Sequence, residues 1–113
     1  MYKTLSKAGM PELIGKWLEQ TVVYAPVRQG DYSEFLPLSN SAQADLSLGA
    51  NTRYPPKSLF LPQSEAMFRV QDTEFEPLEA AVSPRLVLGI RPCDARAVQL
   101  LDDVFMDEDH PDP

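Results

Sequence analysis

Apolar residues recur at helical spacing in two segments of the chain. One segment covers residues 11–20, where Pro11 is a typical early helical residue. The other covers residues 94–105, and either Cys93 or Asp94 can cap its start, Asp being the better cap. Each stripe would face a core, so the pattern predicts helices at about residues 11–20 and 94–105. The two stripes consist of Leu13, Ile14, Trp17 and Leu18, and of Val98, Leu101, Val104 and Phe105.

Between these helices, β-branched and alternating residues predict two hairpins. Residues 21–27 and 32–38 flank a Gly-Asp pair, which is a typical turn sequence. Residues 67–71 and 74–78 flank an Asp-Thr pair and alternate between apolar and polar side chains. The sequence therefore predicts four short strands joined in two pairs.

Two further features predict where strands lie in the sheet. Pro26 has no N–H to donate, so its strand is expected to lie at a sheet edge or to end there. Residues 85–90 form an apolar run that Gly89 and the following proline bound, as in a buried central strand. The predicted fold class is α/β, with α+β as the alternative. It has a mixed β-sheet with two hairpins, a central buried strand at residues 85–90 and two helices packed on the sheet.

Composition limits the classes of partner. The chain has 113 residues, of which 43% are hydrophobic, and this length supports a single domain with one modest core. The net charge of -7 argues against nucleic acid and against anionic membrane surfaces, because both attract basic proteins. No apolar run is long enough to span a bilayer, so no membrane insertion is expected. The single cysteine excludes an internal disulfide and fits a reducing compartment, so we expect a cytoplasmic protein.

The last residues of the chain are acidic and rich in proline. Residues 107–113 carry His110 among carboxylates and prolines, where a histidine is expected to be solvated. A histidine without a second histidine or cysteine nearby does not make a metal site. Because a domain rarely ends on such a segment, residues 1–113 are expected to be the N-terminal domain or a fragment of a longer protein.

The most unusual chemistry follows the predicted strand 85–90, in a segment that contains Arg91, Cys93, Asp94 and Arg96. Ligands of open α/β sheets gather at the carboxyl ends of strands. Cys93 is either a buried, inert side chain or a functional thiol, because a helix N-terminus favours thiolate. Arg91 either bonds a loop carbonyl or contacts an anion or a cofactor phosphate. Asp94 is more simply a helix cap than a catalytic acid.

Other catalytic and binding motifs are missing from the sequence. It contains no Gly-x-Gly-x-x-Gly, no phosphate-binding Gly-Lys-Ser/Thr loop and no Gly-x-Ser-x-Gly elbow. A cysteine hydrolase would need His110 beside Cys93. Because His110 belongs to the acidic C-terminal segment, this kind of enzyme is not expected. The chain is therefore not expected to be catalytic alone, and a small enzyme centred on Cys93 is the weakest option that stays open.

Two stretches, residues 52–68 and residues 89–105, resemble a known family. They are similar to the N-terminal region of iron–sulfur electron-transfer proteins, typified by the beta subunit of sulfhydrogenase and by its counterpart in anaerobic sulfite reductase. The more specific of the two contains Gly89-Ile90-Arg91-Pro92-Cys93-Asp94. The resemblance implies a cytoplasmic protein of anaerobic metabolism whose partners are other subunits of a redox complex. It also adds Lys57 and Glu65 as site or interface residues.

The chain departs from the family in its cysteine content. Family members carry ferredoxin-like 4Fe–4S clusters, each of which needs about four thiolate ligands, whereas this chain has one cysteine. It binds no cluster alone, and Cys93 can be at most one ligand of a cluster completed by the parent protein. The resemblance places 4Fe–4S clusters in the parent complex and allows a flavin on a partner subunit.

Two functions from different classes follow. In the first, the chain is a domain of an electron-transfer subunit that docks partners and surrounds a redox centre, in a hydrogenase- or sulfite-reductase-like complex. In the second, it is a non-catalytic scaffold or protein-interaction domain in which Cys93 is structural.

Overall fold

The computed structural model describes residues 2–47, 49–79 and 83–109. His110, for which a solvated position is expected, lies outside the described residues. Contacts divide the chain into two units, residues 1–55 with 84–91 and residues 56–83 with 92–113. The expectation of a single domain stays a prediction.

The first unit contains the helix α1 (Met10–Leu18), which confirms the first predicted helix. A proline in its first turn suits the fixed backbone angle of that position. Glu12 and Lys16 form an exposed ion pair at 3.1 Å, one helical turn apart. The opposite stripe buries Ile14 and packs Trp17 against the core, as the periodicity predicts.

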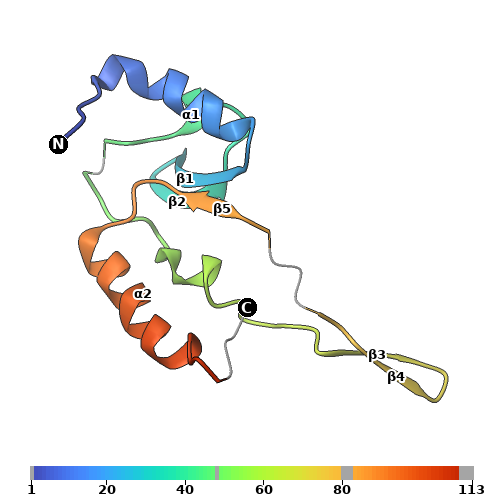
Figure 1. Ribbon diagram of the computed structural model, residues 1–113. Coiled ribbons are helices and arrows are strands. Elements are labelled where there is room, and N and C mark those ends of the chain that lie inside the picture. The colour runs from blue at the N-terminus through green and yellow to red at the C-terminus, as the bar shows by residue number, and fades with distance from the viewer. Residues whose placement is uncertain (1, 48, 80–82, 110–113) are drawn as a thin grey trace. The chain divides into compact units, whose positions relative to one another are not determined.

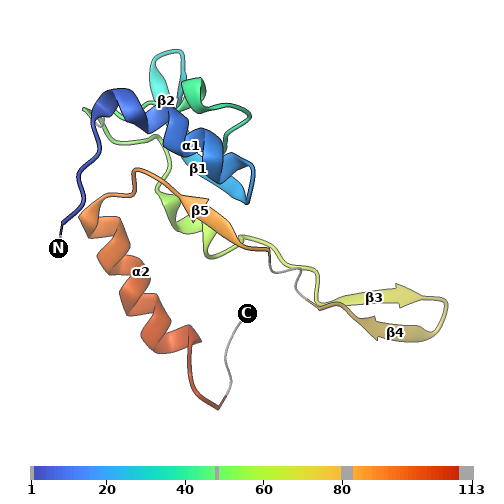
Figure 2. The same cartoon turned by 45° about the horizontal axis from the view of Figure 1, so that its top comes forward.

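The sheet of this unit has three strands in the order β2-β1-β5. β1 (Val22–Gln29) and β2 (Tyr32–Pro37) form the first predicted hairpin, with Gln29 opposite Tyr32. β5 (Arg85–Val87) runs parallel to β1, so the sheet is mixed. In Figures 1 and 2, α1 lies over this sheet.

The position of Pro26 differs from the prediction. Pro26 lies in β1, which is the central strand of the three described strands, and it pairs in register with Phe35 of β2. The missing N–H is tolerated because β5 has already ended: its last residue, Val87, pairs with Tyr24. Beyond that point, the N–H of Asp45 donates to the carbonyl of Pro26 at 2.7 Å.

The prediction of a central buried strand at residues 85–90 is also wrong in position and length. β5 covers three of those residues and lies at the edge of the sheet. Arg85 is exposed, and Leu86 and Val87 are half-buried. An apolar run does not distinguish a central strand from an edge strand, because pairing with residues 22–24 depends on contacts distant in sequence.

The core of the unit lies between α1 and the sheet. Its buried residues are Ile14, Val23, Ala25 and Leu38. Val23 and Ala25 are adjacent on one face of β1, as the period of two in a strand requires. Neither residue has any exposed surface, so this small cluster is the best-buried apolar part of the described chain.

The second unit contains the hairpin of β3 (Phe68–Gln71) and β4 (Glu74–Pro77), which confirms the second predicted hairpin. Figure 2 shows these strands as two antiparallel arrows. Asp72 in the turn has a φ of 55°, a left-handed conformation that aspartate tolerates. The unit also contains a short 3₁₀ turn at Pro56–Leu59.

The second helix, α2 (Pro92–Phe105), begins two residues earlier than predicted. Pro92 occupies the first helical position, where a proline loses no hydrogen bond. Asp94 and Cys93 therefore lie inside the first turn, and the prediction that one of them caps the helix is wrong. Val104, predicted to face a core, is 68% exposed. The half-buried residues of its stripe are Val98, Leu101 and Phe105.

Two helices, a mixed three-stranded sheet and a separate two-stranded sheet make this an α+β fold, the stated alternative within the predicted class. The two hairpins and both helices lie where the residue pattern predicts them, with their boundaries displaced by two residues at most.

Candidate functional site

The segment that leads into α2 is shaped by Gly89. After β5, the N–H of Leu88 still donates to the carbonyl of Tyr24 at 2.8 Å. Gly89 then adopts a φ of +80°, and a Cβ placed on it would lie 3.2 Å from Cδ of Pro26. Glycine is needed here both for its backbone angle and for this close approach. The chain then reaches Arg91, the last residue of the first unit.

Cys93 is a free thiol and is exposed. It occupies the second position of α2, directly after Pro92. Its exposure does not agree with the interpretation of Cys93 as a buried core residue.

The other candidates on α2 have simpler environments. Arg96 donates from Nη1 to Oε1 of Gln99 at 3.1 Å, so its guanidinium is held along its own helix. Asp94 is half-buried in the first turn, where a carboxylate stabilises the helix through its dipole. Arg91, just before the helix, is half-buried.

Lys57 and Glu65, the two residues that the resemblance adds, are both exposed. The backbone carbonyl of Lys57 accepts hydrogen bonds from Phe60 and Leu61 and so closes the 3₁₀ turn. No ion pair joins Lys57 to Glu65 in the described part of the chain.

The six candidates are divided between the two units. Arg91 belongs to the first unit, and the other five belong to the second. Among residues 2–47, 49–79 and 83–109, no group of three or more His, Cys, Asp or Glu side chains could hold a metal ion. A 4Fe–4S cluster needs about four thiolates, and the chain has one cysteine, so its residues alone do not fit such a cluster.

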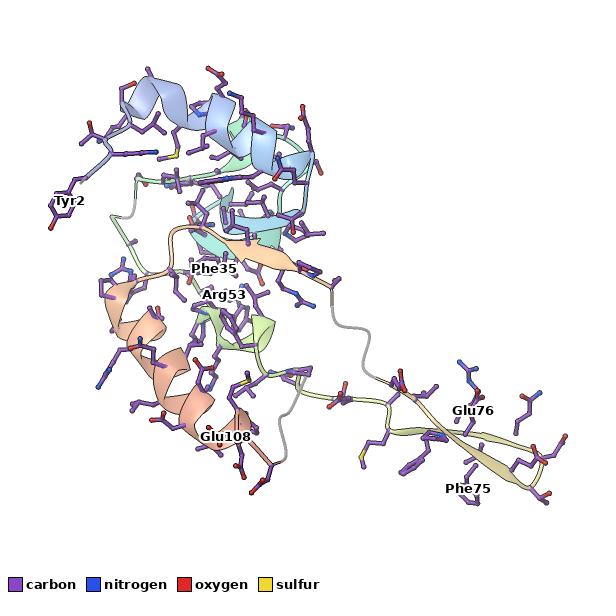
Figure 3. All side chains as sticks on the ribbon, in the orientation of Figure 1. Tyr2, Phe35, Arg53, Phe75, Glu76 and Glu108 are labelled. Carbon is purple, nitrogen blue, oxygen red and sulfur yellow. The ribbon has the colours of Figure 1, made fainter. Side chains whose placement is uncertain are left out.

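Sequence reasoning missed a cluster in the first unit, formed by Arg53 and two tyrosines. The guanidinium carbon of Arg53 lies 4.8 Å from the ring centre of Tyr32 and 5.5 Å from that of Tyr54. The N–H of Arg53 donates to the carbonyl of Ser33 at 2.8 Å. Figure 3 shows the position of Arg53. These cation–π contacts hold residues 52–54 against β2. In the sequence, the only local indication of this cluster is that Arg53 and Tyr54 are neighbours.

Among the described residues, Asp45 is the acidic side chain whose pKa the fold clearly shifts. Hydrogen bonds from the hydroxyl and backbone N–H of Ser47 hold the pKa of Asp45 below its ordinary value, and the charge of Arg28 adds to the effect. The N–H of Ser47 lies 3.1 Å from Oδ1 of Asp45. This geometry is that of an Asx turn, so Asp45 stabilises a loop.

Chemically, the arrangement offers an accessible thiol at a helix start and exposed charges, without a paired base or a complete ligand set among the described residues. In the same part of the chain, no helix is long and apolar enough to cross a membrane.

Comparison with known proteins gives one informative similarity. Over 112 residues, the chain is 28% identical to a protein named sulfhydrogenase 2 subunit beta from Pyrococcus furiosus. No protein-family model and no solved structure matches the chain. The alignment covers 99% of this chain and 33% of the relative, so the chain spans about a third of that protein's length. Nearly the entire chain is thus similar to one part of a sulfhydrogenase subunit.

Proposed function

We propose that this chain is a partner-docking domain of an iron–sulfur electron-transfer subunit, in a hydrogenase- or sulfite-reductase-like complex. The observation that carries the proposal is the similarity over 112 residues to a protein named as a sulfhydrogenase beta subunit. The covered part is a third of that relative, so redox chemistry belongs to the parent protein and its partners.

The number and position of the cysteines favour an auxiliary role at a redox centre. The chain has a single cysteine, and that thiol is exposed at the start of α2. We propose that Cys93 faces a centre completed from outside these residues. Arg91, Asp94 and Arg96 supply charge around it, and Lys57 and Glu65 contact neighbouring polypeptide. The 4Fe–4S clusters, and a flavin where a partner subunit carries one, are bound elsewhere in the complex.

The test uses the complete protein that contains this chain, produced anaerobically with Cys93→Ser or, as the matched control, Ala97→Ser. Ala97 is exposed on the same helix. We expect the unmodified protein to purify with partner subunits and with bound iron. Cys93→Ser should shift the midpoint potential and slow electron transfer by about tenfold, as changes beside a metal centre do, while Ala97→Ser leaves both unchanged.

A complete protein that purifies without iron and without partner subunits contradicts this function. The second candidate, an interaction domain with no role at a redox centre, is favoured by the exposure of every residue of the β3–β4 hairpin. In that case Cys93→Ser leaves potential and rate unchanged while partner subunits are still retained.

A further inference from the structure

The β3–β4 hairpin separates apolar from polar side chains completely. In its register Phe68 pairs with Pro77, and Val70 pairs with Phe75. Residues directly opposite in an antiparallel pair share a face, so these four side chains form one apolar face. The second face consists of Arg69, Gln71, Glu74 and Glu76. Figure 3 shows Phe75 and Glu76 on opposite sides of the hairpin.

The apolar face is exposed. Phe68 is 58% exposed, Val70 59% and Phe75 74%. A two-stranded hairpin is marginally stable in water unless one face packs against something. Three large apolar side chains together on one small face are typical of a protein-interaction site. The polar face, by contrast, is satisfied in water, with Arg69 and Glu76 paired at 3.8 Å.

Charge around the hairpin indicates what covers this face. Residues 67–79 contain four carboxylates and one arginine, a net charge of -3. Complementary binding surfaces carry opposite potentials. The occupant is therefore expected to present lysine or arginine around an apolar groove, and an anionic lipid surface is disfavoured for the same reason.

A second copy of this chain fits the face poorly. Strand dimensions give the hairpin a face of about 14 Å by 10 Å, whereas a stable interface buries about 800 Å² on each partner. Two such faces packed together would fall well short of that area. Each copy would also bring the same acidic rim and a net charge of -7.

We propose that the apolar face of the β3–β4 hairpin, formed by Phe68, Val70, Phe75 and Pro77, docks into an apolar groove flanked by basic residues on another subunit. The hairpin enters the groove with its aromatic side chains, and its carboxylates meet lysine or arginine at the rim. This inference deepens the proposed docking function and rests on it.

The first experiment identifies what contacts the face. The photoreactive residue p-benzoylphenylalanine replaces Phe75 in the complete protein, produced in its native cells, and cross-linked peptides are identified by mass spectrometry. We expect one dominant cross-link to a different chain that purifies in a 1:1 ratio, at an apolar segment with lysine or arginine beside it. A cross-link to the protein's own chain, or to a second copy of it, overturns the proposal.

The second experiment compares two variants that add the same charge on opposite faces. Val70→Glu places a carboxylate in the apolar face, and Gln71→Glu places one on the polar face beside it. Both positions are exposed, but Gln71→Glu places its carboxylate opposite Glu74, so circular dichroism spectra and melting temperatures of both variants are compared with the wild type to check that the hairpin persists. The partner subunit that cross-linking identifies is then purified without the cross-link. Its affinity for the protein should fall by about tenfold or more with Val70→Glu. Gln71→Glu should change it by less than about threefold.

The outcomes separate this inference from the proposed function. Equal affinities of Val70→Glu, Gln71→Glu and the unmodified protein overturn docking through this face but leave a docking domain that uses another surface. A complete protein that retains no partner subunit overturns the proposed function as well. If the affinity between the protein and its partner subunit does not weaken with added salt, the proposed lysine or arginine rim of the partner's groove is contradicted.

Discussion

Gly89 is the residue whose chemical identity the local backbone dictates most strictly. Its positive φ is a conformation that other residues adopt at a cost, and a Cβ there would lie 3.2 Å from Cδ of Pro26, closer than an ordinary van der Waals contact. Gly15 in α1 is the opposite case, because a Cβ there would meet nothing within 4 Å. The same substitution should therefore have opposite effects at the two positions.

Gly89→Ala should lower the free energy of unfolding by about 1–3 kcal/mol, through backbone strain and the contact with Pro26. Gly15→Ala should raise it by about 0.5–1 kcal/mol, because alanine favours the helix. Urea unfolding followed by Trp17 fluorescence measures both, since all three residues belong to the first unit. Equal changes in the two variants would contradict the positive φ assigned to Gly89.

At the scale of elements, β1 organises the first unit because it pairs on both sides and packs against α1. Val22 and Val23 are neighbours in this strand and point to opposite faces. Val22 is 46% exposed, whereas Val23 is fully buried. The two valines thus separate the contribution of the core from the preference of valine for a strand.

Val23→Ala should lower the free energy of unfolding by about 2–3 kcal/mol, because it removes buried methyl groups and leaves a cavity. Val22→Ala should lower it by less than about 1 kcal/mol, since only strand preference and partial burial are lost. Chemical denaturation of both variants gives the difference. If Val22→Ala proves as damaging as Val23→Ala, the strand is inverted relative to the core.

At the scale of the molecule, the ligand inventory decides what the chain can hold. One cysteine is available. A 4Fe–4S cluster needs about four thiolates, so about four copies of this chain would have to converge to supply them. The net charge of -7 works against such convergence.

The isolated chain, treated anaerobically with iron and sulfide, should therefore bind no stoichiometric cluster. The complete protein under the same conditions should bind clusters, because the proposed parent subunit supplies the remaining cysteines. Iron and sulfide analysis with electron paramagnetic resonance measures both samples. A stoichiometric cluster in the isolated chain would show that these residues form a complete site on association.

Signals that act over a few residues predicted most elements correctly. The apolar stripe of α1 and the turn sequences of both hairpins depend on neighbours in the chain, and each element lies where those signals put it. The start of α2 was missed by two residues because Pro92 suits the first helical position as well as a boundary.

The candidate site was less predictable. The sequence indicated Cys93 as the unusual residue, but its burial depends on packing that no local pattern encodes, and the structure leaves it exposed. The cluster of Arg53 with Tyr32 and Tyr54 was missed because it joins a loop to a strand that is distant along the chain.

The amino-acid sequence by itself determined both helices, both hairpins, the acidic charge and the limit of one thiolate, because these depend on local geometry or on composition. Only the tertiary structure decided that β1 is central and β5 is at the edge, since that order depends on pairing between residues 22–24 and 85–87. The tertiary structure also decided that Cys93 and the apolar face of the β3–β4 hairpin are exposed, because exposure depends on which residues pack together.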